Sequence, residues 1–591
     1  MKKNKKNIII LSVIAVVLIL IIIALIVINK NVLNTTKVDL TNLTYKDGKE
    51  TEDIKKYTGD DFQDFLEDYQ NNKLPSIYVT EFLFDGVSQY KPYDLDDFIE
   101  NGNDYDIEAL KITTININTT GNIELSGELK GGMIAVNTND ISKDINIILN
   151  GVNVDTDSKK VPAIYVYNKD INYTNHKVTI KLASNSKNYI NGGKLKKVSL
   201  VGSDELNNYS SKYSGTNKEN YEKYNNYYGV YTSDEINNIL FAKIEASNEK
   251  LRDGDPYYFY KASGAISSDI DLYFEGDGYL EVKSNKKEGI ETKGNLTLGD
   301  GKGDYVVYAM DDCLNTTTSM SYSSNVRNTL TVNVNSLTAI VLDDADEGDA
   351  LDSNGKLVVD GGTIIALSHP GSDSGLDSDN GIYINGGRVI SIGDMYDEVS
   401  SDSKQNFMLL SFNERINSGD LITLLDEKDN VVFSFKTDRT YSNLVYSSKD
   451  LKNGTYYLYK NGDIEGTDNN GFYTSIDKYT KGTQLAYSNK GNIGRMMGGG
   501  QRPNDFDDNN QEDRRGNRPS ENNEDMTPPD DDFKEKNKMN NDNNERPDMP
   551  DKNGFKNDFS PDGINNTTAT NKEFKIEEIA NLFSGVATYS E

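Results

Sequence analysis

Residues 350–362 read Ala-Leu-Asp-Ser-Asn-Gly-Lys-Leu-Val-Val-Asp-Gly-Gly, and residues 375–387, 25 positions further on, read Gly-Leu-Asp-Ser-Asp-Asn-Gly-Ile-Tyr-Ile-Asn-Gly-Gly. The Leu-Asp-Ser triplet, the alternating strand and the closing Gly-Gly fall in register. A third copy, residues 289–299, begins 61 positions before the first. Short strands and glycine turns that recur at a fixed period are typical of a coiled β-solenoid, a scaffold that displays equivalent side chains in ladders.

Strands with period-two alternation extend this pattern over residues 104–402. Asparagine and glycine end most of the strands, and these residues tolerate the backbone conformations that the corners of a coil require. Residues 203–260, rich in Tyr, Asn, Ser and Lys without a period, interrupt the strands and are interpreted as an inserted loop. The pattern therefore predicts an all-β chain.

The segments around these strands differ in composition. Residues 31–103 are interpreted as a stalk or N-terminal cap with a short helix near residues 60–69, and residues 403–490 as a β-rich C-terminal cap with antiparallel strands. Residues 491–570 consist largely of Asn, Asp, Pro and Gly and are predicted to be disordered. Apolar residues at helical spacing predict a short helix in residues 571–591.

Residues 1–30 have the pattern of a membrane anchor. Four lysines precede an apolar run at residues 8–28, which is interrupted only by Ser12. Such a run matches a bilayer core of about 30 Å, and the lysines are expected to stay in the cytoplasm. No small-residue cleavage site follows, so the sequence predicts a single-pass cell-membrane protein with the bulk of the chain outside the cell. The alternative is a cleaved signal and a secreted protein.

The net charge and the residue composition of the chain indicate which classes of binding partner to expect. The net charge of −31 disfavours nucleic acid, whose phosphates an acidic surface repels. Divalent cations and neutral or cation-bridged polymers are better candidates. Cys313 is the single cysteine, so no intrachain disulfide forms. The 37 tyrosines can stack on sugars, or they can simply fill strands, where tyrosine is favoured.

Oxygen-bearing side chains at equivalent places in the copies form the strongest candidate site. In a parallel solenoid such residues stack at about 4.8 Å, and stacked carboxylates are tolerated when a cation such as calcium lies between them. The alternative is that Asp and Asn occupy corner turns because they bond to their own backbone. The predicted metal ligands are Glu291, Asn315, Asp349, Asp352, Asp377 and Asp379.

Signals of catalysis are weak. The only histidines, His176 and His369, lie in unrelated contexts, and the sequence holds no nucleophile elbow, HExxH motif or phosphate loop. Pairs of carboxylates that could hydrolyse glycosides arise by chance in so acidic a chain. A β-elimination lyase needs a basic residue beside calcium, and neither Lys293 nor Arg388 stands out for that role. The sequence thus predicts no enzyme.

Several ordered motifs between residues 104 and 393 resemble the bacterial cell-surface carbohydrate-binding right-handed parallel β-helix family first recognised in cellulolytic clostridia. The Gly-, Met- and Arg-rich residues 494–500 are similar to the tail of that family. The coil motifs that carry the resemblance are Ile-Ile-Leu-Asn-Gly-Val-Asn at 147–153, Gly-Ala-Ile-Ser-Ser-Asp-Ile-Asp-Leu at 264–272, Gly-Asp-Gly-Tyr-Leu-Glu-Val at 276–282 and Glu-Gly-Ile-Glu-Thr-Lys-Gly at 288–294.

This resemblance implies a right-handed, pectate-lyase-like parallel β-helix that binds polysaccharide, including acidic or cell-wall glycans, with calcium along the coils and without known cleavage. The sequence departs from the family pattern at residues 288–291 and 312–315, which lack the aspartate pair. The expected function is a membrane-anchored, extracellular, non-catalytic carbohydrate-binding protein. The alternatives are a polysaccharide lyase or glycoside hydrolase on the same scaffold, and a surface structural or adhesion protein.

Overall fold

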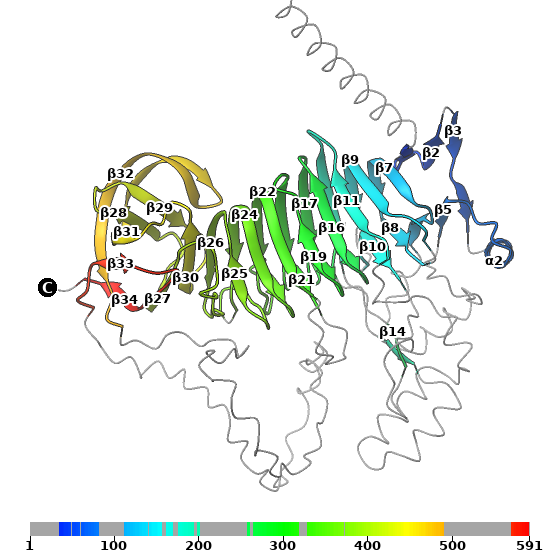
Figure 1. Cartoon of the computed structure of the whole chain (residues 1–591). Coiled ribbons are helices and arrows are strands. Elements are labelled where there is room, and N and C mark those ends of the chain that lie inside the picture. The colour runs from blue at the N-terminus through cyan, green and yellow to red at the C-terminus, as the bar shows by residue number, and fades with distance from the viewer. Residues whose placement is uncertain are drawn as a thin grey trace, which may run out of the picture. The chain divides into compact units, whose positions relative to one another are not determined.

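The structure of the chain is a computed structural model (Figure 1). It describes residues 35–48, 50–58, 61–81, 112–139, 141–156, 161–168, 175–193, 198–200, 257–259, 264–317, 328–371, 373–489 and 569–589.

Short strands that pair in parallel with the equivalent strand of the next repeat make up the central part of the chain. Leu357, for example, lies opposite Ile382, so that the two copies found in the sequence are neighbours in space. Pairing follows three rows. The first contains the N-terminal parts of the long strands β7 (Gly121–Lys130), β9 (Ile145–Asp155), β22 (Leu330–Val341) and β24 (Leu357–Leu367), with β11 (Val178–Leu182), β16 (Leu272–Gly276), β19 (Leu296–Leu298) and β25 (Ile382–Ile384).

The second row contains the C-terminal parts of the same long strands, together with β12 (Lys187–Gly192), β17 (Tyr279–Ser284), β20 (Asp304–Ala309) and β26 (Arg388–Gly393). The third row lies in a separate sheet and contains β6 (Thr113–Ile117), β8 (Gly132–Asn137), β10 (Ile164–Tyr167), β15 (Ile266–Ser268), β18 (Ile290–Thr292), β21 (Leu314–Thr316) and β23 (Leu351–Ser353).

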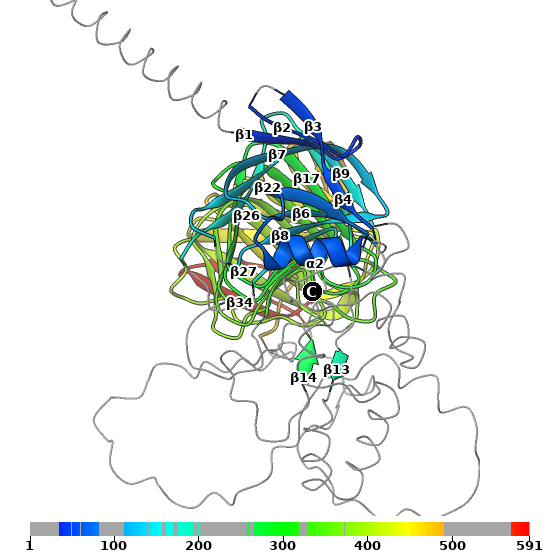
Figure 2. The same ribbon diagram turned by 90° about the vertical axis from the view of Figure 1, so that its right-hand side faces the viewer.

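One apolar core lies between the three rows, which overlap around it when viewed from the N-terminal strands (Figure 2). Alternating Leu, Ile and Val side chains point inward from every row, and each contributes about 1.5–3 kcal/mol when fully buried. Examples from the three rows in turn are Leu272, Leu296, Leu330, Leu357 and Ile382; Leu280, Leu337, Ile364 and Val389; and Ile134, Ile164, Ile290, Leu314 and Leu351.

Glycine at the corner between the first and second rows allows successive turns to approach closely. Gly387, the last residue of the second copy, has φ +85°, and a Cβ there would lie 2.5 Å from the carbonyl oxygen of Gly362. A side chain at this position would have to be accommodated both in a left-handed backbone conformation and against the neighbouring turn. Glycine at position 387 is therefore a requirement of the stacking.

Gly387→Ala is expected to lower the free energy of unfolding by about 2–4 kcal/mol, because backbone strain of about 1–3 kcal/mol is added to a steric clash. Gly419→Ala is the matched control, since Gly419 has φ +84° but nothing within 4 Å of its Cβ position. Its cost should be about 1 kcal/mol, from the backbone alone. Urea unfolding measures both, and equal losses would contradict the close approach at Gly387.

The N-terminal elements extend both sheets. Phe65 of the one described helix packs its ring 5.3 Å from Tyr57 and 6.1 Å from Tyr78, which confirms the short helix expected near residues 60–69. The elements are β1 (Thr35–Asp39), parallel to β7; β2 (Thr44–Asp47) and β3 (Glu50–Asp53), an antiparallel hairpin on β1; and β4 (Lys55–Tyr57), α2 (Phe62–Gln70) and β5 (Ile77–Thr80), of which β5 lies antiparallel to β6.

After β26, the last parallel strand of the second row, the chain forms mostly antiparallel strands with a second hydrophobic core. β26 pairs antiparallel with β30, so these strands continue the same sheet, and β31 and β32 form a long hairpin. Their bounds are β27 (Phe407–Ile416), β28 (Leu421–Asp426), β29 (Val431–Lys436), β30 (Tyr441–Ser448), β31 (Gly454–Asn469), β32 (Phe472–Ala486), β33 (Phe574–Ile576) and β34 (Ala580–Thr588).

The helix predicted in residues 571–591 is wrong, because this segment forms β33 and β34. β34 pairs in parallel with β27 and antiparallel with β32, so partners far away in the sequence decide its structure. The insertion at 203–260 lies outside the described residues except for β14 (Tyr257–Phe259), which pairs antiparallel with β13 (Val198–Leu200). The predicted disordered tail, 491–570, also lies outside them except for its last two residues.

The predicted fold class, a right-handed parallel β-helix solenoid with a β-rich C-terminal cap and one N-terminal transmembrane helix, is corrected by the structure. The fold is all-β, with parallel strands that close around one core and extra strands, mostly antiparallel, that extend the sheets at both ends. The repeat pattern predicts which side chains face the core. It does not determine how the strands pair at the two ends of the parallel region.

The predicted single-pass membrane localisation is also corrected. None of the helices in the described part of the chain is long and apolar enough to cross a membrane. The helix that is described there, α2, has nine residues, whereas a span needs about 20. The apolar run at residues 8–28 lies outside the described residues.

Candidate functional site

Four of the predicted ligands lie in one column along the outer side of the third row. Glu291, Asn315 and Asp352 occupy the middle positions of β18, β21 and β23, where they are direct neighbours in the parallel register. Asp377 extends the column, because Leu376 bridges to Leu351 and the Asp377 amide donates to the Leu351 carbonyl at 2.8 Å. The repeat thus brings together side chains from separate turns of the chain.

A second column lies three residues earlier in each repeat and contains Glu288, Asp312 and Asp349. The backbone aligns them, since the amide of Gly289 donates to the carbonyl of Asp312 at 2.9 Å and that of Cys313 to the carbonyl of Asp349 at 3.1 Å. Of these three residues, only Asp349 is among the ligands predicted from the sequence. Glu288 and Asp312 could have been found from the sequence, because each is an acidic residue that precedes a predicted ligand by three positions. The two columns together are called the acidic columns below.

Asn315 joins the two columns. Its Nδ2 donates to Oδ2 of Asp352 at 3.1 Å and makes a short contact with Oδ2 of Asp312. The residue is 8% exposed, and its Oδ1 is buried without a hydrogen-bond partner. A buried amide oxygen without a hydrogen-bond donor lowers the stability of the fold. A role for this oxygen, such as binding a ligand, would explain why it is buried there.

Burial raises the pKa of the carboxyl groups in the acidic columns, and their mutual repulsion adds to this effect. The pKa of Asp312 is raised to about 7 by burial and by the charge of Asp311, and that of Asp377 to about 6 by burial and by Asp379. Burial, with the charge of Asp312, also holds the pKa of Asp349 and Asp352 well above the ordinary value. At neutral pH the columns therefore have to retain protons or gain cations.

The remaining predicted ligands have roles in turns. Oδ1 of Asp349 accepts from the Ser374 amide at 2.7 Å, and the Asp349 amide donates to Oδ1 of Asp312 at 2.8 Å. Asp379 lies outside the acidic columns on an exposed corner, where it accepts from Nδ2 of Asn354 at 3.3 Å. Turn chemistry thus accounts for Asp379, and for part of the environment of Asp349.

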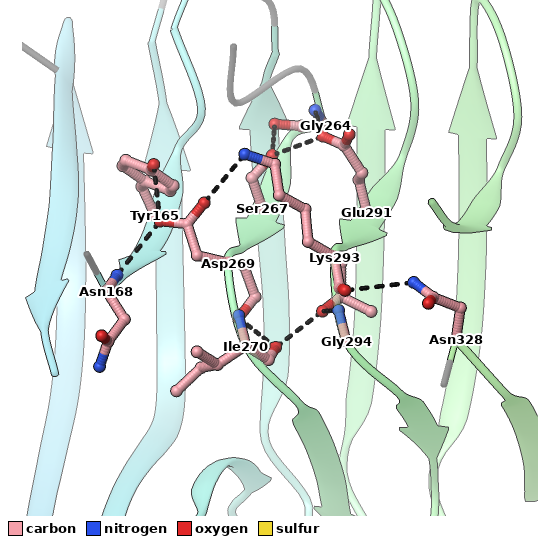
Figure 3. A network of polar contacts seen from close by, with 12 residues as sticks. Tyr165, Asn168, Gly264, Ser267, Asp269, Ile270, Glu291, Lys293, Gly294 and Asn328 are labelled. Atoms are coloured by element: carbon pink, nitrogen blue, oxygen red, sulfur yellow. Dashed lines mark hydrogen bonds and ion pairs between the residues drawn. The ribbon is translucent and has the colours of Figure 1, made fainter. Parts of the chain in front are cut away.

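A buried ion pair lies next to the acidic columns (Figure 3). Nζ of Lys293 is 3.2 Å from Oδ1 of Asp269, and the two side chains are 6% and 2% exposed. Oδ2 of Asp269 also accepts from the Tyr165 hydroxyl at 2.9 Å and from the Asn168 amide at 3.1 Å. The pair links three strands of the third row, and the lysine considered for lyase chemistry is engaged in it.

No group of three or more His, Cys, Asp or Glu side chains in the described residues is arranged as a ready metal site. The donor set around Asn315 nevertheless fits calcium, which prefers carboxylate and amide oxygens. Turning the amide would bring Oδ1 toward the carboxyl groups of Asp312 and Asp352, an arrangement that is favourable with a cation between the oxygens or with a proton on one of the carboxyls. The same side chain can therefore satisfy the carboxylates without a metal and ligate one with it.

Comparison with known proteins identifies one family. Residues 111–209 and 235–395 match the family described as "Carbohydrate-binding domain-containing protein", and this match, which covers less than half of the chain, includes the acidic columns. No curated protein matches the chain. A solved structure, "Structure of the polysaccharide lyase-like protein from C. thermocellum, Gadolinium derivative", is 17% identical, covering 46% of this chain and 87% of that chain with a TM-score of 0.26. A likeness this low carries no argument. The family match supports a function related to carbohydrate, at a coarser level than the clostridial family that the motifs resemble.

Proposed function

We propose that this protein binds polysaccharide and does not cleave it. The observation that carries the proposal is the match to a carbohydrate-binding family over the three-row body. The fold adds an extended surface built from equivalent positions on successive strands, at about 4.8 Å per step, which suits a polymer with repeating units. The net charge of −31 favours neutral polymers, or acidic polymers held through a cation.

Calcium is the proposed cofactor, held by the acidic columns around Asn315. Support comes from the buried Oδ1 of Asn315 without a partner and from the carboxylates of Asp312 and Asp352 that bond to the same amide. A bound divalent cation would supply the positive charge that these carboxylates lack. The protein residues supply the oxygen donors and hold them in register through the parallel backbone.

Lyase chemistry is the second candidate, and the two basic residues considered for it are both engaged. Lys293 lies in the buried pair with Asp269, where it has no access to a polymer. Arg388 lies 3.6 Å from Asp450 and over the ring of Phe472. Neither is placed beside the acidic columns as a free base, which favours binding without cleavage.

A single incubation separates binding from cleavage. The full chain is mixed in calcium buffer with soluble xylan, β-glucan, galactomannan and polygalacturonate, and both retention and new reducing ends are measured. We expect retention of at least one polymer with no release of oligosaccharides. Reducing ends or unsaturated products that grow with time would replace the proposal with an enzyme, and no retention would refute binding.

A further inference from the structure

Three tyrosines surround a carboxylate on the outer side of the second row. Tyr189 lies directly opposite Glu281 in the parallel register of β12 and β17. Tyr279 precedes Glu281 by two positions on the same face, and Tyr308 lies opposite Lys283 on the next strand, β20. Tyr189, Tyr279, Tyr308 and Glu281 are called the tyrosine platform below.

Contacts hold the tyrosine platform in one arrangement. The rings of Tyr189 and Tyr279 lie 6.1 Å apart at 61°, and the Tyr279 hydroxyl donates to Oε2 of Glu281 at 2.8 Å. Tyr308 lies on the neighbouring strand, diagonal to Glu281 in the parallel register of β17 and β20. Tyr189 is 40% exposed and, with Leu582, is one of two large exposed hydrophobic side chains in the described residues.

The column of residues through Glu281 is exposed at the tyrosine platform and buried at its other end. From Glu281 the register continues through Val306 and Thr338 to Ile365 and Ile390. Ile365 and Ile390 are fully buried in the second core, under the C-terminal strands. The same outer face is thus covered by the protein itself at one end, whereas at the other end it carries the exposed ring of Tyr189 and the partly exposed rings of Tyr279 and Tyr308.

A sugar polymer fits this open end. Tyrosine rings present apolar faces to the C–H faces of pyranose rings, and their hydroxyls remain available for hydrogen bonds. Glu281 adds a carboxylate that accepts from sugar hydroxyls, since an ionised carboxylate only accepts. The charge of Glu281 and the net charge of −31 disfavour uronic acids, although Lys283 lies on the same face, so a neutral sugar is the favoured occupant.

We propose that the tyrosine platform is the face that contacts a neutral polysaccharide, with stacking on Tyr189 and Tyr308 and hydroxyl recognition by Glu281. The inference rests on the proposed function and names its binding surface and its class of sugar. The platform lies on the second row, whereas the acidic columns lie on the third, so their contributions can be separated by mutation.

Affinity electrophoresis of the full chain through gels with xylan, β-glucan, galactomannan or polygalacturonate tests this inference. The variants are Tyr189→Ala and Glu281→Gln, each expected to weaken retention by a neutral polymer about tenfold. Tyr383→Ala is the matched control, because Tyr383 is a partly exposed tyrosine on the first row, with Nζ of Lys356 5.1 Å above its ring. Its retention should equal that of the unmodified protein. Thermal unfolding of each variant shows whether it remains folded.

The outcomes distinguish this inference from the proposed function. Loss of retention in both platform variants with Tyr383→Ala unchanged supports the tyrosine platform. Retention by a neutral polymer that survives both platform substitutions overturns it while polysaccharide binding stands, as does retention by polygalacturonate alone. If the unmodified chain is retained by none of the polymers, the proposed function itself fails.

Discussion

Replacement of Lys293 by Met lowers the free energy of unfolding by about 3–5 kcal/mol, because it leaves the buried carboxylate of Asp269 without its cation. Two other partners of that carboxylate, the hydroxyl of Tyr165 and the amide of Asn168, are neutral and cannot balance a full charge. Urea unfolding, followed by circular dichroism, measures the loss.

Lys478→Met is the matched control for the buried pair. Nζ of Lys478 lies 2.7 Å from Glu465, but both side chains are about two-thirds exposed, at 64% and 66%. Exposed pairs contribute about 0–1 kcal/mol, so this change should be nearly neutral. The double variant Asp269→Asn with Lys293→Met should recover much of the loss, since no unpaired charge remains. A loss for Lys293→Met no larger than for Lys478→Met would contradict the burial of the pair.

The second large effect is a dependence of stability on pH and calcium. The pKa of Asp312 is raised to about 7 in the folded protein, by burial and by the charge of Asp311, from the ordinary aspartate value of about 4. Between these two values the folded state holds a proton that the unfolded state has lost, so stability falls as pH rises from about 4 to about 7. Asp377, raised to about 6, acts in the same direction. In chelator we expect a loss of about 2–4 kcal/mol over this window.

Calcium should reverse this loss at pH 7.5, because it binds the ionised carboxylates of the folded state. Asp352→Asn should remove most of the stabilisation by calcium, whereas Asp379→Asn, outside the acidic columns, should leave it intact. Thermal melts in chelator and in excess calcium give the comparison. A melting temperature that is independent of both pH and calcium would rule out the acidic columns as a cation site.

The repeat in the sequence was sufficient to predict which side chains share a column. Leu357 and Ile382 point into the core from neighbouring strands, and Glu291, Asn315 and Asp352 line up outside it, because a fixed period with parallel pairing places equivalent residues side by side. The Gly-Gly corner was likewise predictable, since Gly387 meets Gly362 in the next turn.

Features that depend on pairing between distant segments were not predictable. Residues 580–588 form a strand because they pair with β27, more than 160 residues earlier, and helical spacing gave no hint of that partner. The tyrosine platform joins Tyr189 to Glu281 across the inserted segment, so that no local pattern connects them. In the sequence, Glu288, Asp312 and Asp349 each precede a predicted ligand by three positions. Only the register of the strands shows that these three residues stack.

The most direct test of the central claim is retention of the full chain in polysaccharide gels with calcium and then with chelator. We expect strong retention by at least one polymer in calcium, weaker retention in chelator, and a loss of this calcium dependence in Asp352→Asn. Migration through every polymer gel at the rate seen in a polymer-free gel, in the presence of calcium, would contradict the claim.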